Sequence, residues 1–383
     1  MHRGIATFTL DYGKCPPWLF ERMVKLGREM TRVLIEEYGP DEFIKRISDP
    51  VWFQSLGTVL AFDWNASGLT TILTAALKEA IRGQEKDFGI FIAGGKGKTS
   101  RKTPDEIVSW GEKLSLSPAH TNNLVYNSRM SAKVDSSLVQ DGFQIYHHSF
   151  FFSKSGAWTV VQQGMNTKNA TARRYHWYSE NIDDLIVEPH SGIATQIPQT
   201  SALNLTSRNS DKTRQISTQL ISDGYQTLLS DIEIIKKHST KTSWMATLKR
   251  GADELTLLKL HDIDFAHHPV EGEAFWNSPY LKKILAKLAH LKPETYEKLL
   301  STAGVGPKTI RALSLVSEII YGARPSYEDP ARYSFAHGGK DSIPYPVDRP
   351  TYDQTIEILR QAVVKSRINP LEKDKAIGRL NSR

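Results

Sequence analysis

The segment from residue 299 to residue 310 places two glycines and a proline between two apolar helical patterns. Gly304 and Gly306 allow a backbone turn that uses positive φ angles. Pro307 suits the first turn of the following helix, where an N–H group would have no intrahelical partner. The segment therefore predicts two helices that are joined by a tight turn.

Glycines leave the backbone of such a turn without side chains on one side. The N–H groups of the turn then point outward together with the positive end of the second helix, which makes a site for an anion the size of a phosphate. Lys308 adds a cation at the same place. We expect Gly304, Gly306 and Lys308 to contact the backbone of DNA. The alternative is a helical hairpin turn that binds no ligand.

The bulk composition is compatible with this partner. The chain has 383 residues, which suits two or three domains, and its formal net charge of +7 favours a polyanion. Its single cysteine, Cys15, excludes a disulfide framework and a cysteine-rich zinc site. A chain without disulfide bonds suits a reducing compartment, so we predict a cytoplasmic protein. Because the sequence has no long apolar run, we predict no signal peptide and no membrane partner.

Helical and strand patterns alternate in the first half of the chain, which predicts an α/β domain over residues 1–200. Helices are expected at 16–38, at 69–82 and within 104–140, where Pro118 breaks the pattern. Strands are expected at 5–10, 58–62 and 87–93, and as a hairpin of 143–152 with 157–163 that turns at Ser155–Gly156.

Pro, Ser, Thr, Asn and His are frequent from about 182 to 210, which predicts an irregular linker and a domain boundary near 200. Helical patterns then predict a helical domain over residues 201–383. Its helices are expected at 213–237, 243–248, 277–290, 293–302, 308–322 and 351–365, and the charged tail from 369 is expected to fray.

The predicted helix–turn–helix resembles the helix-hairpin-helix of DNA-repair proteins. The fold class is thus an α/β N-terminal domain plus an all-α C-terminal domain containing a helix-hairpin-helix. Together with Pro346–Pro350, the turn is similar to the DNA glycosylase superfamily, which excises damaged bases. This resemblance implies that Lys308 attacks the sugar C1′ and that Asp348 stabilises positive charge on the sugar. Asp348 lies forty positions after Lys308, further than in the superfamily, and Arg349 stands where a histidine often follows.

Two adjacent histidines, His147 and His148, enter the predicted hairpin, and Asn166 ends its second arm. This order resembles the phospholipase D superfamily, in which a strand histidine attacks phosphorus without a metal and an asparagine completes the pocket. Phe150 and Ser149 stand where the superfamily has lysine two positions after the histidine. Strand alternation sends the two histidines to opposite faces, so only one can belong to a site. The superfamily needs two histidines, which leaves a homodimer open.

Basic residues mark further candidate contacts with DNA. Lys96 and Lys98 belong to a glycine-rich loop whose spacing differs from a Walker loop, so we expect a surface that contacts phosphates. Arg173 and Arg174 stand beside aromatic residues, a combination that suits a nucleic-acid surface. Lys340 follows two glycines in a second loop of this kind. The alternatives are a buried polar network for the arginines and a flexible turn for Lys340.

The remaining histidine and aspartate pairs, His267–His268 and Asp262–Asp264, have no standard metal-site spacing, so neither a metal nor another cofactor is predicted. Four segments (Gly94–Lys96, Trp158–Asn166, Ala172–Trp177 and Ser334–Asp348) resemble an uncharacterised archaeal and bacterial family that is known only as a domain of unknown function. That resemblance implies no activity.

We therefore expect a DNA-binding protein of DNA repair or processing. Three hypotheses remain open: a DNA glycosylase with abasic-site lyase activity, a metal-independent nuclease similar to phospholipase D, and a non-catalytic DNA-binding adaptor.

Overall fold

The computed structural model describes residues 15–60, 66–196, 198–199, 201–238, 246–250, 253–257, 278–331, 333–334 and 349–381. The expected strand at 5–10, the pairs His267–His268 and Asp262–Asp264, and the candidate site residues Lys340 and Asp348 lie outside these ranges.

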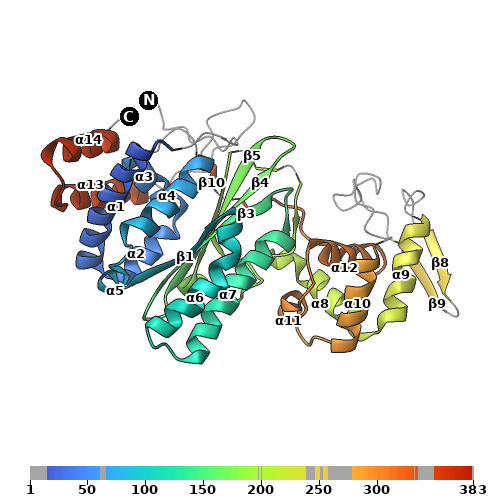
Figure 1. Ribbon diagram of the computed structural model, residues 1–383. Helices are drawn as coiled ribbons and strands as arrows, with labels where there is room; N and C mark the ends of the chain where they lie inside the picture. Colours follow the sequence, from blue (N-terminus) through green and yellow to red (C-terminus); the bar gives the residue numbers. More distant parts are fainter. Residues whose placement is uncertain are drawn as a thin grey trace, which may run out of the picture.

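A mainly antiparallel sheet forms the centre of the molecule (Figure 1). Its strands, in spatial order, are β1 (Ile90–Lys96), β3 (Gln144–Ser153), β4 (Trp158–Asn166), β5 (Thr171–Tyr178), β6 (His190–Thr195) and β10 (Tyr333–Ser334). The first five are antiparallel to their neighbours, and the short β10 runs parallel to β6. Both faces of the sheet are covered, so its central strands are buried along most of their length, and they carry buried polar side chains beside the apolar ones.

The N-terminal helices cover one face of this sheet. They are α1 (Pro17–Tyr38), α2 (Pro40–Ile47), α3 (Pro50–Val59), α4 (Ala66–Ala80) and the single turn α5 (Glu85–Phe88). The last two helices of the chain, α13 (Arg349–Lys365) and α14 (Pro370–Asn381), return to this layer and pack beside α1 and α3 (Figure 1). Leu359 and Val363 of α13 share a buried core with Met30 of α1.

Two helices, α6 (Thr103–Lys113) and α7 (Pro118–Ser137), cover the other face. Pro118 begins α7 and Ser117 caps it, since the Ser117 hydroxyl accepts from the His120 amide. Directly after α7, the two-residue strand β2 (Val139–Gln140) pairs with β7 (Leu203–Asn204). This layer links the sheet to the helices that follow.

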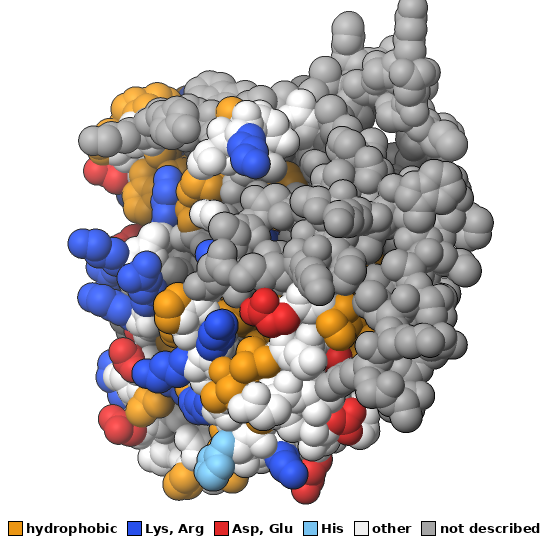
Figure 2. All heavy atoms as spheres, turned by 90° about the vertical axis from the view of Figure 1, so that its right-hand side faces the viewer, with side chains coloured by type: hydrophobic (Ala, Val, Ile, Leu, Met, Phe, Trp, Pro, Cys, Tyr) orange, Lys and Arg blue, Asp and Glu red, His pale blue; other side chains and the backbone are white. Residues whose placement is uncertain are grey.

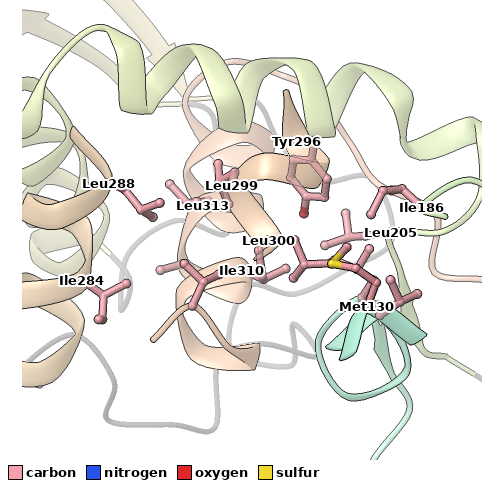
Figure 3. Close-up of a cluster of buried hydrophobic side chains, with 14 of the residues drawn as sticks. Met130, Ile186, Leu205, Ile284, Leu288, Tyr296, Leu299, Leu300, Ile310 and Leu313 are labelled. Carbon is pink, nitrogen blue, oxygen red and sulfur yellow. The ribbon is translucent and has the colours of Figure 1, made fainter. Parts of the chain in front are cut away.

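A second group of helices extends from α7 (Figure 1). It contains α8 (Asp211–Ser222), α9 (Tyr225–His238), α10 (Pro279–Leu291), α11 (Tyr296–Ser301) and α12 (Pro307–Ile319), together with the strand pair β8 (Ala246–Arg250) and β9 (Asp253–Leu257). Met130 of α7 belongs to the same buried core as Leu300 of α11 and Ile310 of α12 (Figure 3). One core therefore crosses the expected boundary near residue 200, which itself stays a prediction.

Several expected elements differ in the structure. The strand expected at 58–62 overlaps α3, which runs to Val59, and the region called a linker contains β6. The long helix expected at 213–237 is two helices, because Gly224 adopts a positive φ of 107° between α8 and α9. The segment at 246–248 is a strand instead of a helix, and α14 occupies most of the tail that was expected to fray.

Candidate nucleic-acid interface

The turn between α11 and α12 has a backbone that only glycine fits at one position. Gly304 has a φ of +97°, and a Cβ atom there would lie 2.4 Å from Cδ1 of Ile284. The next residue, Val305, is buried in the helical core, and its amide donates to the carbonyl of Thr302 at 3.1 Å. The turn is thus held tightly against α10, as the two predicted helices with a glycine turn require.

Lysine side chains bind the carbonyl groups of this turn. The ammonium group of Lys133, in α7, donates to the carbonyl oxygens of Leu300 at 2.7 Å and Thr302 at 2.8 Å. Lys287, in α10, donates to the carbonyl of Ala303 at 2.9 Å. Burial, together with the nearby charge of Lys287, lowers the pKa of Lys133. These cations neutralise the negative end of α11 where it faces the protein.

Two further side chains complete this arrangement. The hydroxyl of Tyr280 donates to the carbonyl of Gly304 at 3.1 Å. The amide nitrogen of Gln140, in β2, donates to the carbonyl of Pro307 at 3.1 Å, and its oxygen accepts from Nε of Arg311 at 2.5 Å. The carbonyl side of the turn is therefore bound by α7, β2 and α10.

The backbone amides of the two glycines, unlike the carbonyls of the turn, are not bound by other groups of the described chain. Gly306 caps α12 without a side chain, and Pro307 has no N–H group. Within the described part of the chain, the amides of Gly304 and Gly306 have no hydrogen-bond partner. Lys308 follows in the first turn of α12 and is exposed. An anion at this position would meet backbone N–H groups, the positive end of a helix and a lysine.

The other predicted lysines lie elsewhere in the fold. Lys96 ends β1, and Lys98 lies in the 3₁₀ turn that follows it; both are exposed. The ammonium group of Lys96 lies 6.0 Å from the ring centroid of Tyr146, at the edge of the sheet. Contact of these lysines with DNA stays a prediction.

The two histidines occupy opposite faces of β3, as strand alternation predicted. His147 faces α4, where its Nε2 atom lies 3.2 Å from the hydroxyl of Thr74. His148 faces α7, where its Nε2 atom lies 2.9 Å from the hydroxyl of Ser128. Both rings are buried, and burial lowers the pKa of His147 to about 3 and also lowers that of His148. Both histidines are therefore neutral and enclosed at pH 7.

A hydrogen-bond chain fixes the orientation of His148. The amide nitrogen of Gln162 donates to Asp135, so its oxygen faces Nδ1 of His148, at 2.9 Å. Nδ1 then donates to Gln162, and Nε2 accepts the hydroxyl proton of Ser128. A serine, a histidine and an orienting amide in this order can activate a hydroxyl group. Ser128 is only 2% exposed, so the chain serves here as a buried polar network.

The two arginines are buried, as the alternative of a buried polar network requires, and do not lie on the expected nucleic-acid surface. Arg173 is fully buried and pairs with Asp141 at 2.7 Å and with Asp329 at 2.6 Å. Arg174 is also buried, and its guanidinium donates to Gln54 at 3.2 Å. A charged side chain is buried at tolerable cost only where protein groups replace its water, and these groups do so. DNA could reach neither guanidinium group without displacing them.

Asn166 has a local structural role at the end of β4. Its side-chain oxygen accepts from the backbone amide of Lys168 at 3.0 Å, which shapes the turn into β5. It is half-buried and lies three residues beyond Gln163, the β4 partner of His147. The histidines, Asn166 and the turn at Gly304 therefore belong to different elements of the fold.

Sequence reasoning missed the residues that bind the turn: Lys133, Gln140, Tyr280 and Lys287. Each comes from a segment that was recognised only as helix or as the end of a helix. The positions of Tyr280 and Lys287 relative to the apolar residues of α10 could have indicated that both side chains lie on the side of the helix that faces the turn. No local signal connects Lys133 with residues near 300, because the contact joins distant segments.

Two further features are absent from the described ranges: a cluster of metal ligands and a membrane-spanning helix. Among these residues, no group of three His, Cys, Asp or Glu side chains is placed to hold a metal ion. None of the described helices combines the length and the apolar character that crossing a bilayer demands.

The fold defines a mixed protein in which helices cover both faces of a mainly antiparallel sheet and extend into a helical group. A family model described as "Protein of unknown function (DUF763)" matches residues 4–347, and the chain belongs to this family. This agrees with the family resemblance seen in the sequence. No curated protein and no solved structure matched the chain.

Proposed function

We propose that this protein binds DNA through the turn between α11 and α12, in which Gly304, Gly306 and Lys308 contact the sugar–phosphate backbone. One observation carries the proposal: side chains bind the carbonyls of the turn on the protein side, while the amides of its two glycines have no partner in the described chain. A phosphate oxygen is an acceptor that suits such amides. In this proposal the two helices act as a helix-hairpin-helix.

The charges around the turn support an anionic partner. Neither α10 nor residues 298–317 contain an Asp or Glu. Five lysines of this region are exposed: Lys282, Lys283, Lys287, Lys298 and Lys308. Lys and Arg side chains also gather on one side of the face that the C-terminal helical group presents (Figure 2). Such a surface attracts the phosphate backbone in a manner that depends on salt.

Fluorescence anisotropy with a labelled DNA oligonucleotide at several salt concentrations tests the proposal. We expect the wild-type protein to bind at low ionic strength. Lys308→Ala should weaken binding and reduce the slope of log K against log salt by about 1, since one phosphate contact is lost. Lys298→Ala is the matched control, because Lys298 is exposed nearby but pairs with Glu294 at 2.6 Å. Absence of wild-type binding, or equal effects of both substitutions, would refute the proposal.

Chemistry on DNA is a further step of this proposal. The DNA glycosylase and abasic-site lyase hypothesis needs the Lys308 amine to form a Schiff base with the sugar C1′, with loss of water, and Asp348 to lie nearby. Borohydride would reduce that Schiff base to a stable protein–DNA adduct. An adduct formed by the wild type and lost in Lys308→Ala supports a lyase in DNA repair, and its absence supports the non-catalytic adaptor.

The hypothesis of a metal-independent nuclease rests on His147 or His148. Their burial does not favour it, because a nucleophile must reach the phosphorus atom of its substrate. Cleavage of DNA in the presence of a chelator, lost in His147→Ala or His148→Ala, would support this hypothesis over simple binding.

A further inference from the structure

Tyr280 presents its ring to solvent directly beside the turn. It lies in the first turn of α10 and is 59% exposed. Its hydroxyl donates to the carbonyl of Gly304 at 3.1 Å, so the ring is anchored at a residue whose amide has no hydrogen-bond partner in the described chain. A single exposed aromatic residue needs no explanation. An exposed ring that is fixed beside a candidate phosphate site is different, because a base next to a bound phosphate could stack on its face.

The neighbours of Tyr280 on α10 are cations. Lys283 and Lys287 follow at spacings of three and seven residues, which places them on the same side of the helix. Lys287 confirms this side, since its ammonium group reaches the carbonyl of Ala303 in the turn. An aromatic ring and two lysines therefore line α10 where it meets the turn, in a segment without acidic residues.

We infer that the preferred DNA at this surface is a strand with unpaired bases, in which one base stacks on Tyr280 while the adjacent phosphate binds the turn. The inference rests on the proposed function. In a duplex, neighbouring base pairs cover the faces of each base, and the grooves expose only base edges. In a single strand the faces are free, and aromatic side chains next to cations bind them with little dependence on sequence.

Three labelled probes of equal length test the inference by anisotropy: a single strand, the corresponding duplex, and a strand of abasic sugar–phosphate units without bases. We expect the wild type to bind the single strand at least about tenfold more tightly than the abasic strand, because only bases can stack. The single strand should also bind more tightly than the duplex. Tyr280→Ala should bind the single strand about tenfold more weakly than Tyr280→Phe does, since both variants lack the hydroxyl bond to Gly304 and only Phe keeps the ring, whereas the two variants should bind the abasic strand equally.

Two variants serve as controls. Tyr280→Phe keeps the ring and loses only the hydroxyl, so it should retain most of the preference for the single strand. Tyr126→Ala removes another exposed tyrosine, whose hydroxyl donates to Glu297 at 2.5 Å, and should change no affinity. If Tyr280→Ala has a lowered melting temperature, Tyr280→Leu replaces it, because leucine retains apolar contacts without an aromatic face.

The outcomes separate this inference from the proposed function. If the wild type binds none of the three probes at low salt, the proposed function itself fails. If it binds the duplex or the abasic strand as tightly as the single strand, the inference is overturned and the proposed function stands. Equal losses of Tyr280→Ala on the single and abasic strands would also overturn the inference.

Discussion

Lys133 of α7 donates its ammonium group to the carbonyl oxygen of Thr302 at 2.8 Å, across 169 positions of the sequence. The same group binds the carbonyl of Leu300. A helix that packs on the central sheet thereby sets the orientation of the turn that we propose for DNA binding. The turn is therefore connected to the helix layer that covers the sheet, and substitutions in α7 should change DNA binding at the candidate interface.

Replacement of Lys133 by methionine should weaken DNA binding without removing a phosphate contact. The apolar stem remains, but the carbonyls of Leu300 and Thr302 lose the ammonium group, and Thr302 keeps only the amide of Val305, so the turn is held less firmly. We expect lower affinity with an unchanged salt slope in anisotropy titrations, in contrast to Lys308→Ala. Lys133→Arg keeps a donor and should recover part of the affinity. A salt slope reduced by Lys133→Met would identify Lys133 as a direct phosphate contact instead.

Gly304→Ala should lower the free energy of unfolding, whereas Gly306→Ala should not. A φ of +97° costs an L-residue about 1–2 kcal/mol, and the new methyl group would also clash with Ile284. Gly306 has a φ of −153°, and its Cβ position is open. Urea unfolding of both variants measures the difference. Equal stability of the two variants would show that position 304 accepts a Cβ atom and that the turn is not tight.

The buried histidines should make the protein less stable in acid. Burial lowers the pKa values of His147, His148 and His176 in the folded state, to about 3 for His147, whereas an unfolded histidine titrates near 6.5. Between these pKa values the unfolded state binds more protons, so the free energy of unfolding falls as the pH drops below about 6.5. Each histidine contributes up to about 1.4 kcal/mol per pH unit within this window.

Urea unfolding between pH 7 and pH 4.5 measures this slope. His147→Asn should reduce it by about one histidine's share. His290→Asn, which makes the same substitution at an exposed position of α10, is the control. A slope that His147→Asn does not alter would mean that folding leaves the pKa of His147 unchanged, against the lowering that burial predicts.

The pair of Arg173 with Asp329 should be important for stability because it is buried. Both terminal nitrogens of Arg173 donate to the carboxylate of Asp329, at 2.9 and 2.6 Å. Asp329→Ala leaves the buried guanidinium with Asp141 as its remaining carboxylate partner, so we expect a loss of about 3 kcal/mol in the free energy of unfolding.

The matched control for this pair is exposed. Glu188→Gln breaks the pair of Glu188 with Arg208, which lies on the surface, and should cost under about 0.5 kcal/mol in the same urea unfolding experiment. If both substitutions cost the same, burial would not govern these ion pairs.

Local patterns predicted much of the fold. The apolar spacing of α1, the break at Pro118 and the hairpin of β3 with β4 all appear in the structure. The tight turn at Gly304 was also predicted, because a positive φ angle at that position favours glycine and depends only on the local backbone. The helix break at Gly224 was missed, since the apolar pattern continues across it and hides the positive φ.

Long-range pairing was not predictable from the sequence. The burial of Arg173 depends on its ion pairs with Asp141 and Asp329, which are distant in the sequence and which no local pattern connects with it. Similarly, α13 and α14 follow the C-terminal helices in sequence but pack on α1 and α3. The candidate interface shows the same division, because its glycines were evident while the side chains that bind its carbonyls come from α7, β2 and α10.

The central claim is that the amides of Gly304 and Gly306 face a DNA phosphate. The most direct test is the amide spectrum of protein labelled with ¹⁵N at glycine, titrated with a short single-stranded DNA at low salt. We expect the signals of Gly304 and Gly306 to shift most and to return as salt is added. If DNA binds while these two signals stay in place and other glycines move, the turn is not the binding site.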